Sequence, residues 1–188
     1  RTTTPETAFI VEFLVRNADI VADCGAHHGL ITLLAAKEIG VEGHVFAFEA
    51  LPRNADTLKC NIELNKLNNV TVENLAVGES SAFIHFVDDS NGYVTDDVSG
   101  LDSVRVKMIS LDEFFKEKDH PDFIKIDVEG NEINVLKGAR NILKGTPRLA
   151  IEFHTVSYPD AVGALREFMG LMDVDRYTIY IQLKIDAP

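Results

Sequence analysis

Residues 20–49 read IVADCGAHHGLITLLAAKEIGVEGHVFAFE, and this stretch decides the fold. An apolar run leads to Asp23, and Gly25 and Gly29 then bracket a turn into a helical segment. A second apolar run ends on Glu49. Strand, helix and strand within about 30 residues form a βαβ unit of ordinary size. The sequence therefore predicts two parallel strands, the first followed by a glycine turn and the second ending on a carboxylate.

Strand and helix patterns alternate along the rest of the chain, which is typical of a parallel sheet with helices on both faces. We predict an α/β fold with a doubly wound, mostly parallel sheet, formed by a single domain over residues 1–188. Residues 1–18 are expected to form an amino-terminal helix that packs on the sheet or covers it as a lid. The predicted strands are residues 20–24, 44–49, 70–75, 122–127, 148–153 and 177–183, and the predicted helices are residues 29–38, 53–66, 110–117, 131–143 and 159–172.

A β-hairpin insertion near residues 79–109 interrupts this alternation. SAFIHFV and VRVKMIS have the composition of antiparallel strands, and the acidic loop of residues 88–102 joins them. The loop is polar and contains two glycines, so we expect it to be exposed. It is either a solvated connection or a flap that selects the substrate.

Composition and charge exclude several classes of protein. The chain has 188 residues, of which 46% are hydrophobic and 26% are charged, so it is globular and not disordered. Its net charge of −12 argues against binding to nucleic acid or to an anionic membrane surface. Neither an apolar run of about 18 residues nor a secretory signal pattern is present. The two cysteines, in a predicted strand and a predicted helix, fit buried thiols, and we expect a cytoplasmic location.

The glycine turn favours a particular class of cofactor. A dinucleotide fingerprint would require glycine where His27 and Leu30 stand, and no Gly-Lys-Ser/Thr phosphate loop is present. A turn with fewer glycines is less suited to a pyrophosphate. S-adenosylmethionine has no phosphates, and its amino-acid end can lie against the backbone of the turn while Asp23 stands near its ammonium group. Glu49 can bind both hydroxyls of the ribose.

The third predicted strand adds Asn74 and Ala76 beside the expected position of the adenine. In a doubly wound sheet, ligands bind at the carboxyl ends of the strands, where the strand order reverses. The residues predicted to contact S-adenosylmethionine are Asp23, Gly25, Ala26, His27, Gly29, Glu49, Asn74, Ala76 and Asp127.

Six segments, in order, resemble the FkbM family of S-adenosylmethionine-dependent methyltransferases: VADCGAHHG, FAFEALPRNADTLKCN, NLAVG, SLDEFF, FIKIDVEGNEINVLKGA and IEFH. They cover roughly residues 20–154. The resemblance implies a seven-stranded class I (Rossmann-like) methyltransferase fold and methylation of an oxygen on a small molecule or sugar. His27 and Ala50 depart from the family, in which Asn and Pro are common at these positions.

The fourth and fifth strands carry candidates for removal of the acceptor's proton. We predict His154, Asp127 and Glu152 as catalytic residues, with His154 preferred because its unperturbed pKa lies close to working pH. Lys125 lies in an apolar run and requires a carboxylate partner, which Glu152 could supply. Together with Glu129, the three candidates could bind a magnesium ion that holds an acceptor diol. Nothing in the spacing demands a metal, and none is predicted.

The leading hypothesis is an O-methyltransferase that converts S-adenosylmethionine to S-adenosylhomocysteine, with a small molecule or sugar as acceptor and without a nucleic acid or membrane partner. One alternative is an N-methyltransferase acting on RNA or protein. The Asn/Asp-Pro-Pro-Tyr/Phe tetrad of many such enzymes is absent, and residues 127–130 read DVEG. Another alternative is a domain that binds the cofactor without catalysis. The sequence leaves the acceptor and the oligomeric state open.

Overall fold

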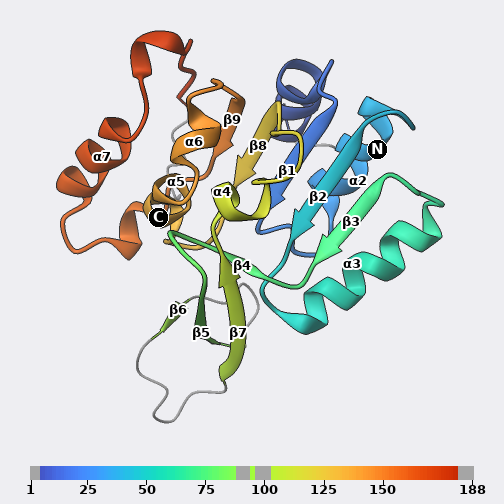
Figure 1. Cartoon of the computed structure of the whole chain (residues 1–188), viewed down its shortest axis with the longest axis horizontal. Coiled ribbons are helices and arrows are strands. Elements are labelled where there is room, and N and C mark those ends of the chain that lie inside the picture. Colours follow the sequence, from blue (N-terminus) through green and yellow to red (C-terminus); the bar gives the residue numbers. More distant parts are fainter. Residues whose placement is uncertain (1–4, 88–93, 96–102, 182–188) are drawn as a thin grey trace.

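The computed structural model describes residues 5–87, 94–95 and 103–181. Its centre is a five-stranded parallel sheet with the strand order β3-β2-β1-β8-β9. Figure 1 shows this sheet between layers of helices, with a second, smaller sheet beyond the carboxyl ends of its strands. The parallel strands are β1 (Ile20–Cys24), β2 (His44–Phe48), β3 (Val70–Glu73), β8 (Phe123–Ile126) and β9 (Arg148–Ile151).

The order of the strands determines where a ligand can bind. The chain runs outward from β1 through β2 to β3, then returns to the other side of β1 with β8 and continues to β9. The strand order therefore reverses between β1 and β8, and the crevice at the carboxyl ends there is the usual ligand site of such sheets. These five strands confirm the prediction of a doubly wound parallel sheet.

Two hydrophobic layers cover the sheet, because successive side chains of a strand point to opposite faces. Ala22 of β1 packs in a cluster with Phe115 and Leu136, whereas its neighbour Val21 packs with Ala35 and Val45 on the other face. Helices follow the strands along the chain and supply these layers. They are α2 (Leu30–Ile39), α3 (Pro52–Leu64), α4 (Leu111–Phe114), α5 (Glu132–Lys137), α6 (Arg140–Leu143) and α7 (Ala161–Gly170), with short 3-10 turns at Thr155–Ser157 and Val174–Arg176.

The predicted insertion is present as the smaller sheet, with the order β4-β7-β5-β6. The predicted hairpin is confirmed, since β5 and β7 pair antiparallel from Ala82↔Met108 to Val87↔Ser103. The strands are β4 (Ala76–Val77), β5 (Ala82–Val87), β6 (Val94–Thr95) and β7 (Ser103–Ile109). Most of the acidic loop, and with it the proposal of a flap, lies outside the described residues.

The amino-terminal segment packs on the sheet. It forms a short α-helix, α1 (Pro5–Phe9), which continues as a π-helical segment, η1 (Ile10–Val15). Val15 is fully buried in the cluster that contains Val21, and η1 lies against α2 and β9. These contacts agree with a packing role for the segment.

Four predictions of secondary structure and burial need correction. The strand expected at 177–183 is absent from residues 177–181, and residues 182–183 lie outside the described part. The helix expected at 131–143 divides at Gly138, where a side chain would meet the Gly78 carbonyl oxygen. Of the helix expected at 110–117, only α4 is formed. Cys24 is buried as expected, but Cys60 is exposed. Within the described residues, no helix has the length and apolar character to cross a membrane.

The turn after β1 requires a glycine at position 25. Its φ is +79°, and a Cβ there would lie 1.8 Å from the carbonyl oxygen of Asp127. The β1–α2 turn therefore passes directly against the end of β8, and any side chain would push the two apart.

We predict that Gly25→Ala destabilises the fold more than Gly40→Ala. Both glycines have a positive φ, so alanine strains either backbone by roughly 1–3 kcal/mol. Only at Gly25 does the methyl group also collide with backbone, since no atom lies within 4 Å of the Cβ position at Gly40. Urea unfolding of both variants measures the difference, and equal free energies of unfolding would contradict the close approach.

Candidate active site at the carboxyl ends of the strands

A pocket of about 530 Å³ opens where the strand order reverses. Four segments line it: the β1–α2 turn, the end of β2, the β3–β4 connection and the loop after β8. Most lining residues fall within the ranges 25–28, 48–50, 75–77 and 127–129, and Leu30, Ile31, Phe86, Lys125 and Asn131 complete the lining. Segments far apart in the sequence thus meet at the edge that the sequence predicted.

The β1–α2 turn is fixed to the end of β2 by backbone hydrogen bonds. The backbone N–H groups of Gly25 and Ala26 both donate to the carbonyl oxygen of Phe48, at 3.0 and 2.9 Å. His27 has a φ of +50°, and its backbone N–H donates to Oε2 of Glu49 at 2.8 Å. The turn and the carboxylate therefore form one wall of the pocket.

Glu49 lies on this wall although only 6% of it is exposed. Besides the bond from His27, its Oε1 accepts the backbone N–H of Leu51 at 2.9 Å and the side-chain amide of Asn54 at 3.4 Å. The donors of the protein thus hold a carboxylate at the edge of the pocket.

Six of the nine residues predicted to contact the cofactor line this pocket, namely Gly25, Ala26, His27, Glu49, Ala76 and Asp127. The other three, Asp23, Gly29 and Asn74, are not among the lining residues. For these three, contact with the cofactor stays a prediction.

Asp23 is fully buried. Its Oδ2 accepts the Thr32 hydroxyl at 2.6 Å, which ties β1 to α2. Gly29, with a φ of +95°, precedes the first residue of α2 and packs against Leu58. The side-chain amide of Asn74 donates to the carbonyl oxygens of Glu49 and Ala50, at 2.8 and 3.0 Å.

The side chain of Lys125, a residue of β8, is almost fully buried against the end of β1. Its ammonium donates to the carbonyl oxygen of Gly25 at 2.8 Å and lies 3.3 Å from Asp127 and 3.5 Å from Asp23. Burial lowers the pKa of Lys125, but the charges of Asp23 and Asp127 outweigh it, and the net pKa is raised. The carboxylates beside Lys125 are thus Asp23 and Asp127, where the sequence analysis suggested Glu152.

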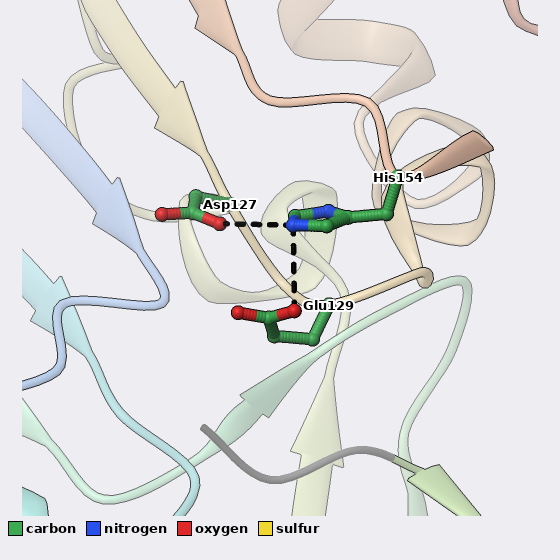
Figure 2. Close-up of side chains that lie close together, drawn as sticks. All are labelled: Asp127, Glu129 and His154. Atoms are coloured by element: carbon green, nitrogen blue, oxygen red, sulfur yellow. Dashed lines mark ion pairs between the residues drawn. The ribbon is translucent and has the colours of Figure 1, made fainter. Parts of the chain in front are cut away.

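The predicted catalytic residues Asp127, Glu152 and His154 lie close together just after the ends of β8 and β9. Nε2 of His154 lies 3.3 Å from Glu129, 3.9 Å from Asp127 and 3.9 Å from Glu152. Figure 2 shows the imidazole of His154 facing the carboxylates of Asp127 and Glu129. Since Asp127 and Glu129 also line the pocket, this group of side chains adjoins it.

Glu132 is a site residue that the sequence analysis missed. It is fully buried, and its Oε1 lies 2.8 Å from Nδ1 of His154. The Gly130 backbone N–H and the Tyr158 hydroxyl also donate to Glu132, at 2.9 and 3.0 Å. A signal existed in EINVLKGA, because Glu132 precedes Val135 and Leu136 by three and four residues and so shares their buried helix face.

The carboxylates shift the proton affinity of their neighbours. Burial lowers the pKa of His154, but the hydrogen bond and charge of Glu132, with the charges of Glu129 and Asp127, give a net increase. Burial raises the pKa of Glu129, the charge of His154 lowers it, and the surrounding carboxylates raise it further. Negative charge is therefore concentrated at this point.

Comparison with known proteins shows which family the chain resembles. The family described as "Methyltransferase FkbM domain" matches residues 23–177. The hexuronic acid methyltransferase AglP of Haloferax volcanii is 30% identical over 164 residues, which cover 83% of this chain and 66% of AglP.

Solved structures share the fold. The methyltransferase FkbM of Methylobacillus flagellatus superposes with a TM-score of 0.61 at 21% identity, over 90% of this chain and 42% of that one. An rRNA methylase of Streptococcus thermophilus gives a TM-score of 0.58 at 14% identity, over 100% and 91% of the two chains. This chain thus spans less than two thirds of AglP and less than half of the Methylobacillus protein.

The family match begins at Asp23 in β1 and extends past His154, so it includes the pocket and the side chains around His154. The fold is that of the class I methyltransferases among its structural neighbours. The chain belongs to the FkbM family of S-adenosylmethionine-dependent methyltransferases.

Proposed function

We propose that the chain transfers a methyl group from S-adenosylmethionine to a hydroxyl group of a sugar or a related small molecule. The observation that carries this proposal is the position of Asp127. It lies on the wall of the pocket and also within 3.9 Å of His154, so the pocket for a cofactor adjoins a group of proton acceptors.

In the proposed complex, the adenosine occupies the pocket and its ribose donates to Glu49. A carboxylate has about four acceptor positions, and three are occupied by donors of the protein. One acceptor position remains for a ribose hydroxyl. The hydrogen bond from Asn54 is long, so a second ribose hydroxyl could replace it at low cost. The amino-acid end of the cofactor would lie along residues 25–27, and the adenine beside Ala76.

Methyl transfer needs the acceptor oxygen, the methyl carbon and the sulfur in line. The oxygen forms a bond to the methyl carbon, the carbon–sulfur bond breaks, and its electron pair remains on sulfur. The hydroxyl proton goes to the group formed by His154, Asp127 and Glu152. Holding two reactants in this geometry contributes on the order of 7–11 kcal/mol. A positioned base adds about 10²–10⁴-fold in rate.

The proposed acceptor is inferred from the related protein AglP and from the net charge of the chain. AglP, whose name describes a hexuronic acid methyltransferase, favours a sugar acceptor for this chain. The fold alone does not select the acceptor, because an rRNA methylase shares it. A net charge of −12 speaks against RNA, since binding to phosphates needs a basic surface.

We predict that Glu49→Ala weakens binding of S-adenosylhomocysteine by about 1–3 kcal/mol, the range for a lost charge-assisted hydrogen bond. Isothermal titration calorimetry measures the affinity. Glu73→Ala is the matched control, because Glu73 ends the neighbouring strand β3 but does not line the pocket. Absence of binding by the wild type, or equal affinities for the two variants, would overturn the proposed cofactor site.

We also predict that the chain transfers labelled methyl groups to hydroxylated sugars, including hexuronic acids and their glycosides, and not to bulk RNA or protein. Chromatography and mass spectrometry of the products would locate the new methyl group on oxygen. Labelling of RNA without labelling of any sugar would favour the N-methyltransferase alternative. Binding of the cofactor without transfer to any acceptor class would favour the non-catalytic alternative.

A further inference from the structure

Asp127, Glu129 and His154 have the arrangement of a metal-binding group. Each offers one ligand atom, and these three atoms lie within 4.8 Å of one another. Nε2 of His154 is 3.3 Å from Oε2 of Glu129 and 3.9 Å from Oδ1 of Asp127. Around one octahedral ion with bonds of about 2.1 Å, neighbouring ligands lie about 3 Å apart and opposite ligands about 4.2 Å apart. Both measured distances fall within this range. Figure 2 marks the two ion pairs that they join.

A buried side chain outside this group sets the direction of the histidine. Nδ1 of His154 is 2.8 Å from the fully buried Glu132, which the Tyr158 hydroxyl and the Gly130 backbone N–H hold in turn. Nδ1–H therefore donates to Glu132, and Nε2 is left to face Asp127 and Glu129. Histidines that bind metals usually have this arrangement, with the second ring nitrogen donating to a carboxylate.

The charges around the group favour a cation. Lys125 is shared between Asp23 and Asp127, and His154 faces both Glu129 and Glu132. These four carboxylates thus face two basic side chains. A divalent ion bound among them would reduce the repulsion between neighbouring carboxylates.

We propose that Asp127, Glu129 and His154 bind one divalent cation that holds the acceptor through two of its oxygen atoms. Two carboxylates and an imidazole suit Mn²⁺, because carboxylates favour Mg²⁺ and Mn²⁺ while imidazole favours transition metals. Asp127 and Glu129 line the pocket, so the remaining positions of the ion face the space beside the cofactor. This assignment rests on the proposed function and specifies its substrate class, an acceptor with adjacent oxygen donors such as a diol or a hydroxy acid.

The ion would act on the acceptor hydroxyl. Coordination lowers the pKa of the hydroxyl, so its proton leaves to Glu152, which lies 3.9 Å from Nε2 and outside the three ligands. The bound oxygen then attacks the methyl carbon, and the carbon–sulfur bond breaks with its electron pair on sulfur. Charge balances, because the sulfonium becomes a neutral thioether and the alkoxide becomes a neutral ether.

The test is direct binding of Mn²⁺ to the whole chain after dialysis against EDTA, followed by electron paramagnetic resonance of free Mn²⁺. We expect one Mn²⁺ per chain. Glu129→Gln removes a ligand and is expected to abolish binding, and Glu132→Gln is expected to weaken it by about 10–100-fold, as for other residues that orient a metal-bound histidine. Glu117→Gln, at an exposed carboxylate elsewhere, is the control and should bind as the wild type does.

Parallel titration of the wild type with S-adenosylhomocysteine separates this inference from the proposed function. Binding of S-adenosylhomocysteine without binding of Mn²⁺ or Mg²⁺ would overturn the metal site and leave the cofactor site intact. Equal Mn²⁺ affinity in the wild type and Glu129→Gln, with both variants folded by circular dichroism, would also overturn it. Full methyl transfer by the EDTA-dialysed chain, unchanged by added Mn²⁺, would overturn the role in acceptor binding.

Discussion

The buried ammonium of Lys125 joins the two halves of the site. It binds the carbonyl oxygen of Gly25 in the cofactor turn and lies between Asp23 at the end of β1 and Asp127 after β8. These strands are neighbours only because the strand order reverses between them. One cation therefore fixes the distance between the turn that would hold the cofactor and the carboxylate that would face the acceptor. A buried ammonium is stable only with such partners, so the three groups depend on one another.

On the acceptor side, a second buried charged side chain is also held by hydrogen-bond partners. Glu132 has no exposed surface, yet it accepts three hydrogen bonds and so keeps His154 directed at Asp127 and Glu129. The loop after β8 thus presents two carboxylates toward the pocket, while the helix that follows it holds the histidine from behind. The proposed chemistry, with or without a metal ion, depends on this support because Glu132 holds the imidazole that faces the two carboxylates.

The sequence was sufficient for the parallel sheet, because β1, β2 and β8 are apolar runs covered on both faces. It also located Glu49 and Asp127, since strand ends in such a fold meet at one edge. The direction of individual side chains was harder to predict. Asp23 follows the alternation of β1 into the interior, and only the packing of Thr32 and Lys125 against it explains why a carboxylate is tolerated there.

Strand register and helix breaks limited how much of the remaining structure could be predicted from the sequence. Residue alternation grouped Lys125 with Asp127, and Glu152 with His154, but left open whether the two groups face each other. The register opposes Lys125 to Ala150, and the ammonium lies beside Asp23 and Asp127. Glu132 was missed because an acidic residue in the first turn of a helix is favourable without any further role. The predicted helix 131–143 divides at Gly138, which lies against Gly78. Gly78 is distant in sequence, so this contact was not visible in the local pattern.

The most direct test of the account is a crystal structure of the chain with S-adenosylhomocysteine. The account predicts the nucleoside in the pocket between the β1–α2 turn and Ala76, with ribose hydroxyls within about 2.5–3.2 Å of the Glu49 carboxylate. A nucleoside bound elsewhere, or one in the pocket while Glu49 contacts only His27, Leu51 and Asn54, would contradict it.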